Sequence, residues 1–154
     1  MKALTLRRPW PWAIFCEGKR IENRTWAPPP ALLGQRLAIH AGQGNDQSGA
    51  EAILGAHGDR YDLREVERGA LSKRFGMFAT GIVGVVTVVG VATSPEQARA
   101  RGFDVRWWRG PLGWLLAEPV ALHKPIECQG RLGLWELTPG LERRLLAQIE
   151  RSAA

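Results

Sequence analysis

The chain has 154 residues, the size of one domain, and a chain of this length buries about two-thirds of its surface on folding. Hydrophobic residues make up 45% and charged residues 23%, which excludes wholesale disorder and collagen-like or fibrous repeats. With 21 basic and 15 acidic residues the net charge is +6, and a basic surface favours polyanions such as nucleic acid. The alternative is codon bias, since 17 of the basic residues are Arg.

The positive charge lies in two stretches. Residues 1–40 hold seven basic and two acidic groups, and residues 99–131 hold six and three. The segments 41–98 and 132–154 carry no positive excess. We therefore expect the first two stretches to meet the phosphates of a nucleic acid.

Cysteine usage and hydropathy predict a cytoplasmic protein without a membrane segment. Cys16 and Cys128 are too few for a disulfide framework or a zinc site built on Cys pairs, so we interpret them as reduced, buried thiols. No leader peptide is expected at the N-terminus. The uncharged run Phe75 to Pro95 is about as long as a membrane helix, but its β-branched residues and glycines favour a buried strand.

The first 40 residues predict three strands and one helix. Residues 3–6 form a short apolar strand, and a proline at 9 or 11 opens a helix over 10–17, because a first-turn proline sacrifices no hydrogen bond. Gly18 ends that helix as a C′ glycine does. The next strands are expected over 21–26 and 36–40.

The remaining sequence predicts an insertion, more strands and two further helices. Residues 42–49 form a polar loop, and 50–74 suit two amphipathic helices parted by Gly58-Asp59, so about 43–76 is a helical insertion. The elements expected after the Val-rich strand are a helix over 95–101 with Ser94 as N-cap, strands over 113–123 and 132–137, and a helix over 141–151. This order predicts a single-domain α+β fold, a small β-barrel with peripheral helices.

The densest chemistry lies between residues 17 and 24. On a strand that starts at Ile21, Glu22 and Arg24 share one face, Asn23 points away, and Lys19 leans over the same face from the strand entrance. Such a cluster supplies donors for a phosphate or a base edge, and a carboxylate that accepts from an exocyclic amine or acts as a general base. The alternative is a surface ion pair, which contributes little.

A second candidate is the tryptophan-rich segment Arg106-Trp107-Trp108-Arg109. It places two large rings between two cations in a predicted loop, a composition that suits base stacking and phosphate contact. In the alternative interpretation, one ring packs in the core and the other caps the barrel.

Metal and cofactor motifs are not expected. The three histidines lie far apart without Cys or carboxylates at ligand spacing, and the serines lack a nucleophile-elbow context. The glycines of Gly130 to Gly133 match neither a P-loop nor a dinucleotide-binding pattern. His40, at a strand end, either faces a pocket or is a hydrogen-bonded structural histidine.

These segments together resemble the ASCH (activating signal cointegrator homology) domain family of the PUA-like superfamily. That family's hallmark is glycine, any residue, lysine, two residues, glutamate, any residue and arginine. Lys19, Glu22 and Arg24 fit it, although Glu17 stands at the glycine position and Gly18 directly precedes the lysine. The other matching segments are LTLRRPWPWA at 4–13, LAIHA at 37–41, the Val-rich strand from Gly81, GWLL at 113–116 and GRLGLWEL at 130–137. Only about residues 43–76 lie outside the resemblance.

The resemblance implies a PUA-like β-barrel whose cleft is lined by the hallmark motif, with RNA or single-stranded DNA as the ligand and room for a flipped or modified base. One branch of the family looks like an amidohydrolase of an acylated cytidine that uses a lysine and a hydroxyl residue, and Glu22 occupies the hydroxyl position here. Other members are associated with RNA cleavage. A hydrolase of a modified nucleoside or of RNA is therefore the alternative, with Lys19 and Glu22 as catalytic residues that activate a water.

The expected function is nucleic-acid binding, with no cofactor, no metal and no membrane partner. A protein-interaction adaptor is a third class, and it predicts no salt-dependent affinity for nucleic acid. The candidate ligand-binding residues are Arg7, Arg8, Trp10, Lys19, Glu22, Arg24, His40, Arg106, Trp107, Trp108 and Arg109.

Overall fold

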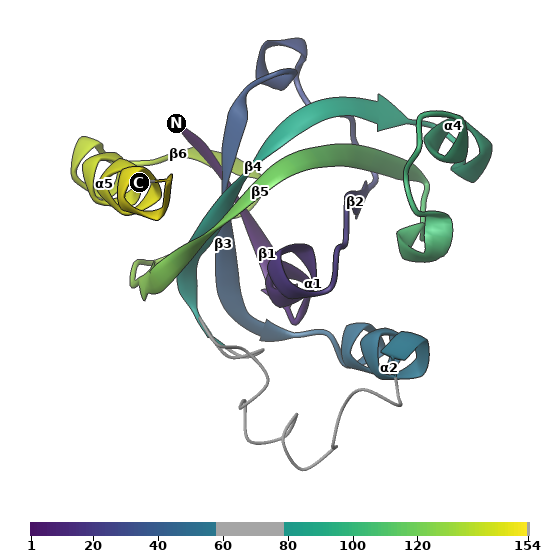
Figure 1. Cartoon of the computed structure of the whole chain (residues 1–154), viewed down its shortest axis with the longest axis horizontal. Coiled ribbons are helices and arrows are strands. Elements are labelled where there is room, and N and C mark those ends of the chain that lie inside the picture. Colours follow the sequence, from purple (N-terminus) through teal and green to yellow (C-terminus); the bar gives the residue numbers. More distant parts are fainter. Residues whose placement is uncertain (58–78, 154) are drawn as a thin grey trace.

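A computed structural model describes residues 1–57 and 79–153, and six strands in these ranges form one curved sheet (Figure 1). The order is β2-β5-β4-β3-β1-β6; β1 and β3 are parallel, and the other pairs are antiparallel. The strands are β1 (Lys2–Arg8), β2 (Ile21–Arg24), β3 (Arg36–Asn45), β4 (Gly81–Ala92), β5 (Leu112–Ile126) and β6 (Leu134–Glu136). The predicted α+β fold with a small, barrel-like sheet is confirmed.

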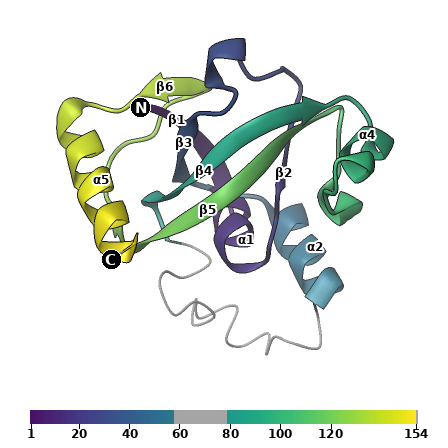
Figure 2. The ribbon, with the colours of Figure 1, turned by 45° about the horizontal axis from the view of Figure 1, so that its top comes forward.

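The curvature gives the sheet an inner and an outer face, each with its own core (Figure 2). Because side chains alternate along a strand, Leu4 and Leu6 of β1 pack inside while Ala3 packs outside. Helix α1 (Trp10–Cys16) covers the inner face, and α5 (Pro139–Ala153) covers the outer face through Leu145 and Ile149. The long Val-rich strand β4 contributes to both cores, with Val83, Val86 and Val88 in the inner one and Ile82 and Val85 in the outer one, as its β-branched composition predicts for a buried strand.

The short elements follow their sequence signals. Helix α4 (Pro95–Ala100) begins after Ser94, whose hydroxyl accepts a hydrogen bond from the Gln97 backbone N–H, and Gly102 follows its end with a φ of 86°. The described residues also contain two single-turn 3₁₀ helices, η1 (Pro30–Leu32) and η3 (Val105–Trp107). Within the described ranges, no helix is both long enough and apolar enough to span a bilayer.

Two predictions about residues 42–49 and the cysteines are wrong. Residues 42–45 are not a loop: they extend β3 to Asn45, and α2 (Gln47–His57) starts within the predicted loop. The second helix predicted up to residue 74 lies outside the described residues. Cys16 is exposed and Cys128 is half-buried, because Cys16 ends α1 at the surface and Cys128 lies two residues beyond the end of β5.

Candidate functional site

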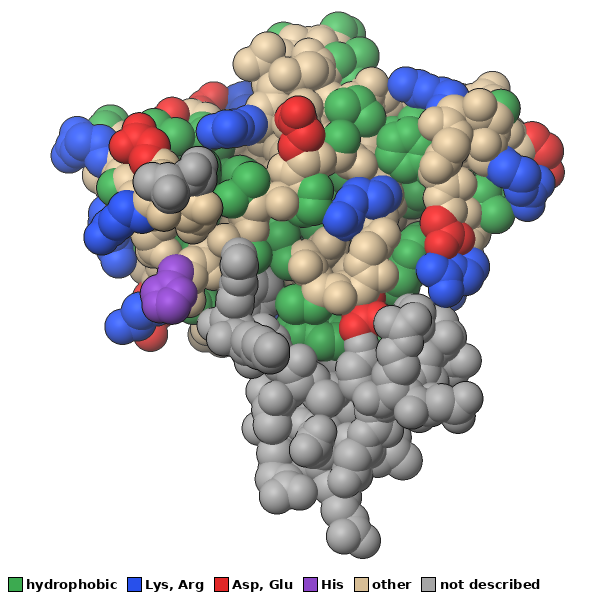
Figure 3. Space-filling view, in the orientation of Figure 1, with side chains coloured by type: hydrophobic (Ala, Val, Ile, Leu, Met, Phe, Trp, Pro, Cys, Tyr) green, Lys and Arg blue, Asp and Glu red, His purple; other side chains and the backbone are tan. Residues whose placement is uncertain are grey.

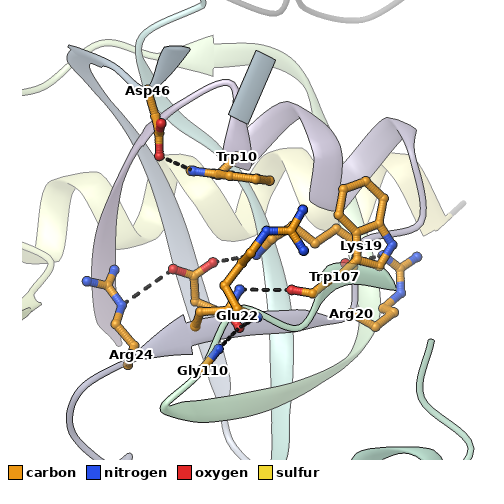
Figure 4. A network of polar contacts seen from close by, with 10 residues as sticks. Trp10, Lys19, Arg20, Glu22, Arg24, Asp46, Trp107 and Gly110 are labelled. Carbon is orange, nitrogen blue, oxygen red and sulfur yellow. Dashed lines mark hydrogen bonds and ion pairs between the residues drawn. The ribbon is translucent and has the colours of Figure 1, made fainter. Parts of the chain in front are cut away.

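The polar cluster predicted on β2 is a buried ion pair with a third charge beside it (Figure 4). The Lys19 Nζ donates a hydrogen bond to Glu22 Oε2 at 2.6 Å, and the Arg24 Nε lies 3.4 Å from Glu22 Oε1. Lys19 is 1% exposed and Glu22 is 8% exposed. The alternative of a surface ion pair is therefore wrong.

The local backbone explains how a lysine and a glutamate come to lie inside. Gly18 adopts a φ of 74°, which turns the chain out of α1 and lets the Lys19 N–H donate to the Ala13 carbonyl. The chain then enters β2, where the two-residue period brings Glu22 and Arg24 to the same side. The helix stop and the strand together aim Lys19 at Glu22.

The electrostatics of the pair are set by burial. Desolvation lowers the pKa of Lys19, and the neighbouring Glu22 carboxylate partly offsets that effect. The ammonium has three N–H groups, and Glu22 is its one hydrogen-bond acceptor among the described residues. Its Nζ also lies 5.3 Å from the centroid of the Trp10 ring, a cation–π contact. Two N–H groups of Lys19 thus have no acceptor among the described residues.

A pocket of about 330 Å³ opens above this pair. In Figure 4 the Trp10 ring lies over the Lys19 amine, and its Nε1 donates to Asp46 Oδ2 at 2.8 Å. Hydrogen bonds from Ser48 and Trp10 lower the pKa of Asp46, so this carboxylate stays charged at neutral pH. The lining residues are Trp10, Lys19, Glu22, Asn23, Asp46, Ser48 and Arg109. Trp10 gives this cavity an aromatic wall, and its other six lining residues are polar or charged, so it places hydrogen-bond donors and acceptors around one flat ring.

Asn23 joins the pocket to the tryptophan-rich segment. Its Oδ1 accepts from the backbone N–H groups of Arg109 at 2.7 Å and Gly110 at 3.2 Å, and its Nδ2 donates to the Trp107 carbonyl at 2.9 Å. The side chain of Asn23 therefore does not point away into solvent. It fixes the backbone that carries Arg109 to the rim of the pocket.

The structure separates the four residues of the segment 106–109. Trp107 is 3% exposed and packs in the inner core, which fits the interpretation that one ring packs in the core. Trp108 is half-buried against the same core, and neither ring lines the pocket. Arg106 is exposed and paired with Asp104, with Nη2 to Oδ2 at 2.6 Å. Arg109 alone of the four lines the pocket.

His40 does not join the other predicted site residues. It contacts Trp135 of the outer core, so it lies on the face of the sheet opposite the pocket's Trp10 wall. Its Nε2 is 3.0 Å from the Cys128 carbonyl, and burial lowers its pKa. The interpretation as a hydrogen-bonded structural histidine fits this contact, and His40 also faces a pocket, a separate one of about 670 Å³ that it lines together with Cys128.

The two N-terminal arginines also stand apart from the pocket lining. Arg7 is exposed on β1, and Arg8 donates from Nη2 to the Gln43 carbonyl at 2.6 Å. Four predicted residues come together in the pocket wall, with Arg24 behind Glu22: Trp10, Lys19, Glu22 and Arg109.

Sequence reasoning missed Asn23, Asp46 and Ser48 as pocket residues. For Asp46 a signal existed, because Asp precedes the helix at Gln47 and its Oδ1 accepts from the Gly49 N–H, as an N-cap does. Asn23 had none, since its partners lie more than 80 residues away. In the described ranges, no three His, Cys, Asp or Glu residues group as metal ligands would.

Comparison with known proteins gives a match in structure and none in sequence. No protein-family model matches the chain, and no curated protein matches it. Its structure is similar to crystal structures of two mutants of ZmASCH from Zymomonas mobilis, one with a tyrosine changed to phenylalanine and one with a serine changed to alanine. Both are 15% identical to this chain with a TM-score of 0.50, and the matches cover 95% of this chain and 96% or 94% of theirs. At this identity the similarity is one of fold.

Proposed function

The chain has the ASCH-domain fold, and from that premise we propose that it binds single-stranded nucleic acid, RNA in the first place, and takes one base into the pocket. The observation that carries the proposal is the buried Lys19–Glu22 pair on the floor of a pocket walled by Trp10. A charged pair kept out of water costs free energy, so a recognition role explains its presence better than stability does.

Each part of the pocket suits one part of a base. The Trp10 ring offers a flat surface for stacking, which contributes about 1–3 kcal/mol per base in single-strand binders. Lys19 offers two N–H donors to a base carbonyl. Glu22 can accept a hydrogen bond from an exocyclic amine with the lone pairs that Lys19 and Arg24 do not use. The volume of about 330 Å³ suits a single base better than a stack of bases.

The test is the substitution Glu22→Gln, with binding measured for a panel of normal and modified nucleosides and a generic single strand. The change removes a charge-assisted acceptor, so the cognate base should lose about 1–3 kcal/mol of binding free energy while the generic strand hardly changes. Thermal melting confirms that both proteins are folded. A small loss that is the same for every ligand and vanishes at high salt would contradict the pocket.

A second candidate function is hydrolysis of a modified nucleoside or of RNA. The observation that favours it is the lowered pKa of Lys19 beside a carboxylate at 2.6 Å. For an acylated amine, the water oxygen would bond to the acyl carbon as its proton passes to Glu22. The amine would leave with a proton from Lys19, and Glu22 would return its proton to Lys19.

Turnover separates the two candidates. The protein is incubated with modified nucleosides and short RNAs, and the products are read by mass spectrometry. Binding without product supports recognition alone. Product that is lost in Glu22→Gln, with binding retained, supports Glu22 as the general base.

A further inference from the structure

The guanidinium of Arg109 is fixed although the residue is exposed. Its Nη1 donates to two carbonyls of its own segment, that of Arg106 at 3.0 Å and that of Trp108 at 2.9 Å. These bonds use both hydrogens of Nη1. The Nε and Nη2 groups have no hydrogen-bond partner among the described residues, and together they form the edge that binds two oxygens of a phosphate side by side.

The backbone below Arg109 is fixed as well. Asn23 bonds three main-chain groups of residues 107–110, two as acceptor and one as donor, so its amide holds the turn at both ends. Asn23 lies on β2 next to Glu22, which forms the pocket floor together with Lys19. One short strand therefore positions both the floor of the pocket and the arginine at its rim.

We propose that Asn23 is a positioning residue that holds Arg109 as a two-pronged phosphate contact, so that the pocket takes a phosphorylated nucleotide unit in preference to a free nucleoside. The inference rests on the proposed function and adds the phosphate to it. An arginine tied to its own loop loses little side-chain entropy when it binds, which strengthens a contact at an exposed site. A lysine cannot replace it, because an ammonium has no planar pair of donors.

The experiment compares ribonucleosides with their 5′- and 3′-monophosphates and with inorganic phosphate, by calorimetric titration of the full chain. The variants are Arg109→Lys, Arg109→Ala and Asn23→Ala, with Arg143→Ala on the outer helix α5 as a control for loss of one exposed positive charge. In the wild type and in the control, one monophosphate should bind at least about tenfold more tightly than its nucleoside.

Arg109→Lys and Arg109→Ala should remove most of that tenfold difference between monophosphate and nucleoside. Asn23→Ala should reduce the same difference between monophosphate and nucleoside affinity, although Arg109 is still present. A general loss of stability would not produce this selective effect. Arg109 is exposed, so its variants test the phosphate contact even where Asn23→Ala fails to fold.

Each contrary result has a separate meaning. Equal binding of nucleosides and monophosphates by the wild type overturns this inference and leaves the proposed base pocket intact. Inorganic phosphate that binds as tightly as the monophosphates also overturns it, because the site would then be an anion site only. Binding of neither nucleosides nor monophosphates overturns the proposed function itself.

Discussion

Lys19 and Glu22 bring opposite charges into a site that is almost closed to water. Their ion pair is not a net source of stability, because the cost of removing both groups from water offsets their attraction. Neither residue can be lost alone without leaving a buried charge with a weaker partner. The pair therefore limits which substitutions the site tolerates, and it keeps a donor and an acceptor fixed below Trp10.

A double-mutant cycle tests this view of the pair. Lys19→Met should lower the free energy of unfolding by about 3–5 kcal/mol, because it leaves the Glu22 carboxylate buried with Arg24 at 3.4 Å as its remaining cation. Lys19→Met combined with Glu22→Leu should recover most of that loss. Urea unfolding of the wild type, both single variants and the double variant measures the coupling. Losses that simply add would contradict a coupled buried pair.

The burial of His40 predicts that the protein loses stability in acid. Burial lowers its pKa from the ordinary value of 6.5, so the unfolded chain takes up a proton at a higher pH than the folded protein does. The stabilising contribution of neutral His40 is complete above pH 6.5 and is lost as the pH falls through the folded-state pKa. The melting temperature of His40→Asn should therefore fall less than that of the wild type when the pH is lowered from 7.5 into the acid range.

His123 provides the matched control for that measurement. It is exposed on β5, so His123→Asn is the control for replacing a histidine that is not buried. A wild-type melting temperature that does not fall in acid, or a His40→Asn variant with the same slope as the wild type, would contradict the role given to burial.

At the scale of elements, the strands and helices of the described residues were predictable and their edges were not. The strand periodicity located Glu22 and Arg24 on one face, and the capping residues located α4. A loop was predicted over residues 42–45 because this segment contains two glycines. In the structure, Gly42 lies against β1, and an added Cβ would meet the Thr5 Cγ2 at 3.0 Å. Close approach of the backbones, which a sequence does not state, selects glycine there.

The pocket was predictable only in part for the same reason. The spacing of Lys19 and Glu22 on the chain determines their meeting, since both belong to one turn and strand. Asn23 meets its partners near residue 109, and Trp10 meets Asp46, only because β2 pairs with β5 and β1 pairs with β3. Such contacts can be predicted only after the order of the strands in the sheet is known.

Helix α2 supports the aromatic wall of the pocket, and Gly49 is the point of contact. An added Cβ at Gly49 would lie 2.8 Å from Trp10 Cε2 and 3.2 Å from Pro9 Cδ, so Gly49→Ala must displace the ring. We expect a loss of about 1–3 kcal/mol in stability and a drop of about tenfold in nucleoside affinity. Melting and titration measure the two effects separately.

Gly140 in α5 is the control for this substitution. An added Cβ there meets nothing within 4 Å, so Gly140→Ala should raise stability by up to about 1 kcal/mol through helix propensity and leave affinity unchanged. Gly49→Ala that binds as tightly as the wild type would show that the position of Trp10 does not matter to the ligand.

At the scale of the whole molecule, the face seen in Figure 3 carries no single continuous patch of positive charge. Figure 3 shows Lys and Arg side chains spread over the face in view, with acidic side chains between them. Acidic partners also offset single cations locally. Asp104 pairs with the guanidinium of Arg106, and Glu22 lies between Lys19 and Arg24. A net charge of +6 thus gives a general attraction to phosphates, and the site must supply the selectivity.

The salt dependence of single-strand binding tests this division between a general charge and a local contact. For single strands the logarithm of affinity falls with the logarithm of salt concentration, with a slope of about 0.7 per neutralised phosphate. Arg109→Ala should reduce the slope by about that amount, because its Nε and Nη2 face a phosphate, whereas Arg106→Ala should reduce it less, because Asp104 already holds its guanidinium. Fluorescence titration of a short RNA at several salt concentrations measures both slopes. Arg143→Ala should leave the slope as it is.

Two results would contradict this view. Equal slopes for the Arg109 variant and the wild type would remove this loop from the interface. A wild-type affinity that does not depend on salt would favour the adaptor class, since a protein partner does not release the counterions of a phosphate backbone.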